Sequence, residues 1–222
     1  MDILSVFIKG GWLMVPIAIC SIIAVGIIID RYLFLKKNST NKDAFLANLK
    51  SFLKRKDIEG AIAFCMTEKT PISKIMTKGL KKYKLGHQRV KEAIEQAGRQ
   101  EIAEMEKGLS ALATISGVAP LLGFLGTVTG MISAFMKIQD LQGSANPSDL
   151  AGGIWEALIT TAFGLAVGII AYTFYNLLVD KINKMVYDME VVSTDIADFI
   201  ELLETSRVKS SEEVKINNGD LP

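Results

Sequence analysis

The segment GLSALATISGVAPLLGFLGTVTGMISAF, residues 108–135, contains no charged residue. It is longer than the roughly 20 apolar residues that a helix needs to cross a bilayer. Small residues recur in it at alternating steps of three and four, which places them on one stripe of a helix. They are Ala113, Ser116, Pro120, Gly123, Thr127, Gly130 and Ala134. Such a stripe either packs closely against other helices or lines a polar path between them.

The composition of the chain is typical of a membrane protein. Half of its 222 residues are hydrophobic and its mean hydropathy is positive. The net charge of +1 does not indicate a nucleic-acid partner. Cys20 and Cys65 lie far apart and His87 is the only histidine, so we expect neither a disulfide nor a metal site. The sequence has no P-loop, GxSxG or HExxH pattern, and we expect no enzyme activity and no cofactor.

Two further uncharged runs predict two more spans, GGWLMVPIAICSIIAVGIII at 10–29 and ALITTAFGLAVGIIAYTFYNLLV at 157–179. The alternative for the first run is a signal peptide. Its flank lacks a basic region and its small-x-small triplet, residues 24–26, lies inside the run, so a retained helix is favoured. Pro16 either kinks this helix or lies in its first turn. The predicted fold is an all-α membrane protein with three transmembrane helices.

The distribution of Lys and Arg predicts the orientation of the spans. Basic residues follow the first span, precede the second and follow the third, whereas the loop between the second and third spans carries one Lys against three acidic residues. The N-terminus and that loop should therefore be periplasmic, and the long loop and the C-terminus cytoplasmic. The protein is expected in a bacterial inner membrane as a multi-pass protein.

The charged segments that follow the first span and the third span are predicted to be helical. Asp57 is a plausible N-cap, and Thr70–Pro71 marks a break. From Arg89 onward an apolar stripe continues without a breaker into the second span, which predicts one long helix. A similar stripe continues past Asp180 after the third span. We expect a cytoplasmic bundle of these helices, repeated around an oligomeric ring.

The predicted organisation follows from these patterns. It comprises an interfacial helix at 1–9, a first span at 10–35, a cytoplasmic helical region at 36–107, a second span at 108–135, a periplasmic loop at 136–153, a third span at 154–179, a cytoplasmic helix extension at 180–204 and a disordered tail at 205–222.

The third span carries a small stripe of its own, formed by Ala157, Thr161, Gly164, Gly168 and Ala171. Gly126 with Gly130, and Gly164 with Gly168, form GxxxG pairs, which are weak signals of helix packing. Because the second and third spans run antiparallel, Thr127 and Thr161 can lie at similar depth and face the same volume. Two interpretations remain open: close packing with each threonine bonded to its own helix, or a hydroxyl-lined path that also includes Thr160.

No charged residue lies in the interior of any span, and Glu156 stands at the outer edge of the third. A proton path usually needs a titratable group at depth. If this chain conducts protons, a second polypeptide must supply that carboxylate. Glu156 is either an entrance group that collects ions or a carboxylate near a helix N-terminus, where the helix dipole favours it.

Three segments together resemble the MotA/TolQ/ExbB proton-channel family. They are GGWLMVPIAICSIIAVGIIIDRYLFL in the first span, APLLGFLGTVTGMISAF in the second and GIWEALITTAFGLAVGIIAYTFYN in the third. The resemblance covers residues 1–203. MotA-type proteins have a fourth span and a longer cytoplasmic region, so the chain is more similar to the ExbB/TolQ branch.

The resemblance implies a subunit of an energy-transducing inner-membrane motor. In that family five copies form a ring around a pore that holds the single transmembrane helices of an ExbD/TolR-like partner. The aspartate of the partner carries the proton, which fits the absence of a carboxylate from these spans. The motor would pass force to a TonB- or TolA-like protein.

The resemblance also implies roles for single residues. Thr127 and Thr161 match the pore-facing threonines of the family, and Glu156 matches its conserved-motif glutamate. Pro120 matches the proline before the GxxGTV stretch that contains Gly123 and Gly126, and Thr160 is an extra hydroxyl where many members have Ala. The alternatives to ExbB-like service are a TolQ-like role in envelope integrity and a non-conducting membrane scaffold, and the ion is a proton or a sodium ion.

Overall fold

The computed structural model describes residues 10–38, 41–141 and 146–217, and within these ranges it is helical without a strand. The helices are α2 (Met14–Lys37), α3 (Lys42–Lys54), α4 (Ile58–Glu68), α5 (Pro71–Leu80), the 3-10 helix η1 (Tyr83–Leu85), α6 (His87–Met105), α7 (Leu109–Asp140) and α8 (Pro147–Asn217). Three helical stretches are long and apolar enough to cross a membrane. The all-α, three-span prediction is confirmed. The helix expected at 1–9 lies outside the described residues.

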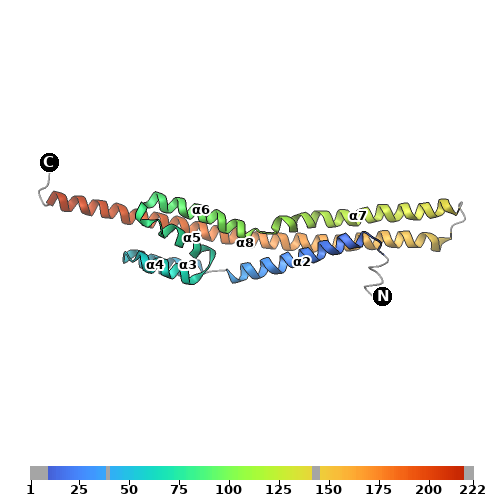
Figure 1. Ribbon diagram of the computed structural model, residues 1–222, viewed down its shortest axis with the longest axis horizontal. Coiled ribbons are helices and arrows are strands. Elements are labelled where there is room, and N and C mark those ends of the chain that lie inside the picture. The colour runs from blue at the N-terminus through green and yellow to red at the C-terminus, as the bar shows by residue number, and fades with distance from the viewer. Residues whose placement is uncertain (1–9, 39–40, 142–145, 218–222) are drawn as a thin grey trace. The chain divides into compact units, whose positions relative to one another are not determined.

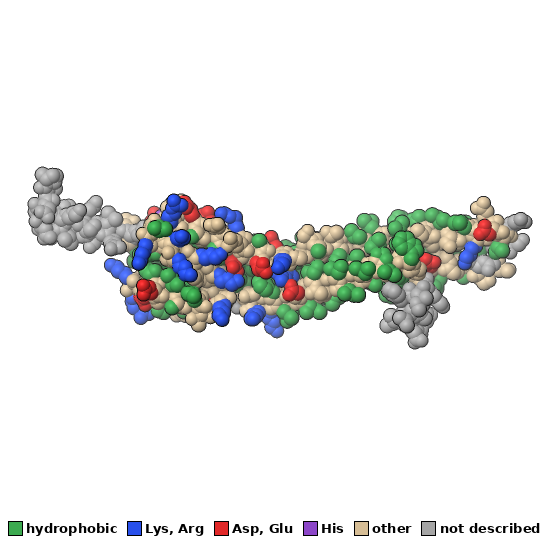
Figure 2. Space-filling view, viewed as in Figure 1, with side chains coloured by type: hydrophobic (Ala, Val, Ile, Leu, Met, Phe, Trp, Pro, Cys, Tyr) green, Lys and Arg blue, Asp and Glu red, His purple; other side chains and the backbone are tan. Residues whose placement is uncertain are grey.

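The chain divides into two compact units. The membrane unit consists of residues 1–33 and 106–180, and the polar unit of residues 34–105 and 181–222. Figure 2 shows hydrophobic side chains over the helices of the membrane unit, whereas Lys and Arg gather over the polar unit. Both α2 and α8 contribute residues to the two units.

The membrane unit consists of α7 and the first part of α8, which run side by side, with α2 along them (Figure 1). Large apolar side chains are exposed on all three helices, which suits contact with lipid; they include Ile22, Ile29, Leu121, Phe124, Phe135, Leu158 and Ile169. Pro16 is the third residue of α2. It therefore lies in the first turn, where its missing N–H breaks no helical hydrogen bond.

Glycines bring the backbones of α7 and α8 into contact. A Cβ atom on Gly164 would lie 2.6 Å from the carbonyl oxygen of Ala119 and 2.8 Å from Cα of Gly123. A Cβ atom on Gly130 would lie 2.8 Å from the carbonyl oxygen of Gly153. We call this contact between α7 and α8 the glycine seam. The small stripes predicted on the two spans thus face each other within one chain.

The polar unit is built around α5. Its apolar side chains Ile72, Ile75, Met76 and Leu80 are buried. Buried residues of α6 and α8 complete the core; they include Val90, Ile94, Ala97, Met189, Val192, Ile196 and Ile200. Burial of such side chains contributes most of the stability of a bundle of this kind. The predicted bundle of the long helices with the 40–87 segment is therefore present within this unit.

Capping side chains fix where the short helices begin. The Asp57 carboxylate accepts a hydrogen bond from the backbone N–H of Gly60 at 2.8 Å, which confirms the predicted N-cap of α4. Thr70 and Ser73 form a capping box at the start of α5, and Pro71 occupies the first turn, so the predicted break at Thr70–Pro71 is also confirmed.

Ion pairs join α3 and α5 to their neighbours in the polar unit. Lys42 Nζ lies 2.8 Å from Asp188 and Lys50 Nζ lies 3.2 Å from Asp195, which links α3 to α8. The hydrogen bond that Lys42 donates to the Asp188 carboxylate raises the pKa of Lys42. Lys74 pairs with Glu101 of α6 at 2.9 Å. These pairs are partly accessible to solvent, so each contributes little and its contribution falls as salt is added.

Three predicted boundaries were wrong. The helix expected to run unbroken from Arg89 into the second span ends at Met105, and α7 begins at Leu109. Gly108 has a φ of 82°, a left-handed conformation that glycine adopts at little cost. At the other end, α8 continues to Asn217, through most of the segment 205–222 for which disorder was predicted. Much of the predicted loop 136–153 is also helical, since α7 ends at Asp140 and α8 begins at Pro147.

The glycine seam predicts a difference between two glycine substitutions. Gly164→Ala places a methyl group against backbone atoms that cannot move aside, so it should lower the free energy of unfolding by about 1–3 kcal/mol. Gly117→Ala in α7 meets no atom within 4 Å and is the matched control. Thermal unfolding of the two purified variants is the measurement. Equal midpoints would contradict the seam.

A second prediction concerns the thiol of Cys65, which is 1% exposed in α4. Burial, with a smaller effect from the Glu68 carboxylate, raises its pKa to about 12. Only the thiolate reacts with maleimides, and at pH 8 about one thiol in ten thousand would be ionised. Labelling of a Cys20→Ser variant should therefore be slow at pH 8 and fast after denaturation. Labelling at the same rate in both states would show that Cys65 is accessible.

Candidate functional site

Thr127 of α7 and Thr161 of α8 meet beside the glycine seam. The hydroxyl of Thr161 donates to the carbonyl oxygen of Gly123 across the two helices at 2.9 Å, and its Oγ1 lies 3.4 Å from Oγ1 of Thr127. The Thr127 hydroxyl donates to Phe124 of its own helix at 2.6 Å. Both threonines are half-buried. The structure therefore brings the two predicted residues together at one level of the antiparallel pair.

Thr160 has a different environment. Its side chain is 1% exposed, and its hydroxyl bonds to the carbonyl oxygens of Glu156 at 2.9 Å and Ala157 at 3.1 Å. A Cβ atom on Gly126 would overlap Oγ1 of Thr160. Gly126 thus makes room for Thr160, and this position fits the packing interpretation of the threonines better than the pathway one.

Pro120 and Gly168 form a second close contact between α7 and α8. A Cβ atom on Gly168 would overlap Cγ of Pro120 and lie 3.2 Å from the carbonyl oxygen of Ser116. Pro120 lies within α7 and lacks the N–H that would bond this carbonyl. Helix interruptions of this kind are tolerated in membranes when a neighbouring helix covers the released group. Gly168 permits that approach.

Glu156 lies at the end of the site away from the Pro120–Gly168 contact. Helix α8 begins at Pro147, more than two turns earlier, so the dipole of the helix N-terminus no longer explains the position of this carboxylate. Glu156 is half-buried and lines a pocket of about 670 Å³. The other lining residues are Ser133, Lys137, Ala151, Gly152, Gly153 and Trp155. Its carboxylate also lies against Gly11, where an added Cβ would overlap Oε1.

Two parts of this arrangement escaped prediction from the sequence. Gly153 is buried against Gly130 and Ala134 and extends the seam by about two turns beyond Thr160. It was missed because residues 136–153 were assigned to a loop, although the pair Gly152–Gly153 before Trp155 was visible. The contact of Gly11 with Glu156 joins residues far apart in the sequence, and no local pattern signals it.

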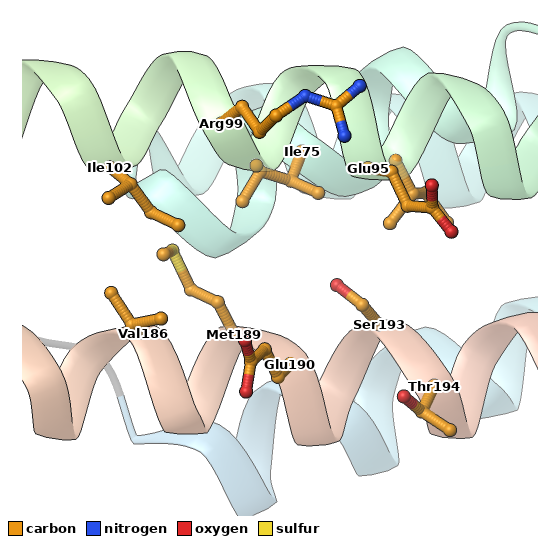
Figure 3. A pocket seen from close by; sticks show the side chains of 11 residues that line it. Ile75, Glu95, Arg99, Ile102, Val186, Met189, Glu190, Ser193 and Thr194 are labelled. Atoms are coloured by element: carbon orange, nitrogen blue, oxygen red, sulfur yellow. The ribbon is translucent and has the colours of Figure 1, made fainter.

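The polar unit contains a separate cleft of about 300 Å³ between α6 and α8 (Figure 3). Ile75, Ile102, Val186 and Met189 line it with apolar surface, and Figure 3 shows Arg99 and Glu95 extending from α6 opposite Ser193 and Thr194 of α8. Its lining contains no His or Cys. In the described part of the chain, no three His, Cys, Asp or Glu residues are grouped as metal ligands.

Comparisons with a family model and with individual proteins point to the same family. Residues 67–191, more than half of the chain, match the model of the MotA/TolQ/ExbB proton channel family. The putative biopolymer transport protein ExbB-like 1 of Synechocystis is 33% identical over 184 residues, which cover 80% of this chain and 70% of that protein.

Two further relatives match over shorter segments. The biopolymer transport protein ExbB of Xanthomonas campestris is 36% identical over 110 residues, 50% of this chain and 43% of that protein. The Tol-Pal system protein TolQ of Haemophilus influenzae is 38% identical over 96 residues, 43% of this chain and 42% of that protein. The matches thus span less than half the length of these two relatives. From the family match and the three apolar spans, the chain belongs to the MotA/TolQ/ExbB proton channel family, in its ExbB/TolQ group, and is a multi-pass membrane protein.

Proposed function

We propose that this protein is the pore-ring subunit of an inner-membrane motor driven by the proton-motive force. It would surround an ExbD/TolR-like single-span partner, in a ring of about five copies as the family resemblance implies. The motor would energise a TonB-like protein that spans the periplasm and serves outer-membrane transport. The relatives named as biopolymer transport proteins support this function. The chain would contribute no enzyme activity and no cofactor.

The observation that carries the proposal is the pairing of Thr127 with Thr161. Their hydroxyl oxygens lie 3.4 Å apart and both are half-buried, in spans whose remaining interior is uncharged. A hydroxyl can donate and accept, so it can stabilise a proton carrier in either protonation state. In a low-dielectric interior such hydrogen bonds act strongly on a charged group. The two threonines can thus serve a carboxylate that arrives on another helix.

Glu156 fits the role of entrance group. It borders the 670 Å³ pocket and lies one helical turn from Thr160 and Thr161 along α8. With the N-terminus in the periplasm and the C-terminus in the cytoplasm, as the distribution of Lys and Arg predicts, this pocket would open on the periplasmic side. Ions would then enter where the membrane potential and the pH gradient both favour protonation.

A specific observation favours a second candidate, a membrane scaffold that conducts nothing. Glycines of both spans pack α7 against α8, namely Gly123, Gly126, Gly130, Gly164 and Gly168, and Thr160 is buried in the same contact. On this view Thr161 also serves only to bond Gly123. The two candidates differ in whether the Thr127 and Thr161 hydroxyls matter after the complex has assembled.

The test replaces one hydroxyl at a time by a methyl group in the complex purified with its partner. Thr127→Val and Thr161→Val should each lower proton flux into liposomes by about ten- to hundredfold, because a hydrogen bond to a charged group is worth about 1.5–3 kcal/mol. Thr114→Val and Thr173→Val are matched controls, one on each helix, since both hydroxyls are exposed and bond only their own helix. Native mass measurement checks assembly.

Each outcome separates the candidates. Loss of flux in an intact complex supports the motor, and wild-type flux in the double variant Thr127→Val/Thr161→Val contradicts it. Loss of the complex itself would support the scaffold. Repeating the flux measurement with a sodium gradient identifies the ion. Complementation of strains that lack ExbB or TolQ separates outer-membrane transport from a TolQ-like role in envelope integrity.

A further inference from the structure

The chain preceding α2 makes a tight turn at Gly10 and Gly11. Gly11 has a φ of 71°, a backbone conformation that residues other than glycine rarely adopt. The backbone N–H of Met14 donates to the carbonyl oxygen of Gly11 at 3.2 Å, so the turn leads directly into the helix. Leu13, Met14 and Ile17, which follow the turn, are buried, whereas Trp12 and Val15 are exposed. The turn is therefore fixed in place by the start of α2.

This turn lies against the part of α8 that carries Glu156. A Cβ atom on Gly10 would lie 3.2 Å from Cγ2 of Ile159, and one on Gly11 would lie 2.7 Å from Cδ of Glu156 and overlap Oε1. The atoms displaced by a side chain at position 11 would belong to the end of the Glu156 side chain and not to the backbone. A side chain at position 11 would therefore displace the carboxylate, in addition to straining the backbone at this positive φ.

The Glu156 carboxylate is thus confined on one side by the backbone of Gly11 and borders the pocket that Lys137, Ser133 and Trp155 also line. The carboxylate can therefore still face the pocket, on the side away from Gly11. Gly26, further along α2, meets no atom within 4 Å, so the close approach is a property of this turn and not of glycines in α2 generally.

We propose that Gly11 is a positioning residue for ion entry: the backbone of the Gly10–Gly11 turn holds the carboxylate of Glu156 at the pocket. The proposal rests on the function proposed above, in which Glu156 receives ions. It gives the first span a part in transport beyond anchoring the protein in lipid.

The test is proton flux through the complex with its partner, reconstituted in liposomes. Gly11→Ala should lower flux by about tenfold or more, because displacing a reacting group by about 1 Å can cost up to a hundredfold. Gly26→Ala lies in α2, the helix that follows the turn, and its added methyl group would meet no atom within 4 Å, so this variant should leave flux unchanged. Native mass measurement confirms that both variants assemble.

A rescue variant separates positioning from loss of structure. Aspartate is one methylene shorter than glutamate, so Gly11→Ala combined with Glu156→Asp should recover flux relative to Gly11→Ala alone, although Glu156→Asp by itself lowers it. Additive losses in the double variant would overturn the proposal, as would unchanged flux in Gly11→Ala. Unchanged flux in Glu156→Gln would instead contradict the entrance role of Glu156 on which the proposal rests.

Discussion

The membrane unit depends on how closely the backbones of α7 and α8 approach. At Gly123 and Gly164 the backbones of the two helices come so near that a single added methyl group would collide with a carbonyl oxygen. Lipid tails are as apolar as Leu side chains, so burial of apolar surface does not drive helices together inside a bilayer. Close contact of many atoms does so instead, and each atom pair contributes little. The glycines, which have no side chain, therefore allow the close contact that holds α7 and α8 together in the membrane.

The same approach sets the position of the polar groups. Because the two backbones are close, Thr161 reaches the carbonyl oxygen of Gly123 on the opposite helix, and its oxygen comes near that of Thr127. A wider spacing would leave each hydroxyl bonded to its own helix only, as the exposed Thr114 and Thr173 are. Packing and polar function are thus not exclusive at this seam. Thr160 serves packing, and the polar function that we propose falls on the Thr127–Thr161 pair.

Much of this could be predicted from residue spacing. The three spans follow from uncharged runs, the cap at Asp57 from its position before an apolar stripe, and the meeting of Thr127 with Thr161 from two stripes on antiparallel helices. The break at Gly108 could not, because the apolar period continues across it and only the backbone conformation of one glycine differs. The helical segment beyond 205 was missed because its polar composition suggested disorder. Extending an existing helix costs far less than starting one, so residues at the end of the long α8 need little propensity of their own.

The glycine seam lies wholly within one chain, and this limits how the protein can meet others. The narrow sides of both helices are already occupied, and the outward-facing surface of the hairpin carries many bulky side chains such as Phe124, Leu158 and Ile169. Bulky residues pack against lipid about as well as against protein. Association of copies within the bilayer would then be finely balanced against solvation by lipid, and the composition and thickness of the surrounding membrane would bear on how many chains gather.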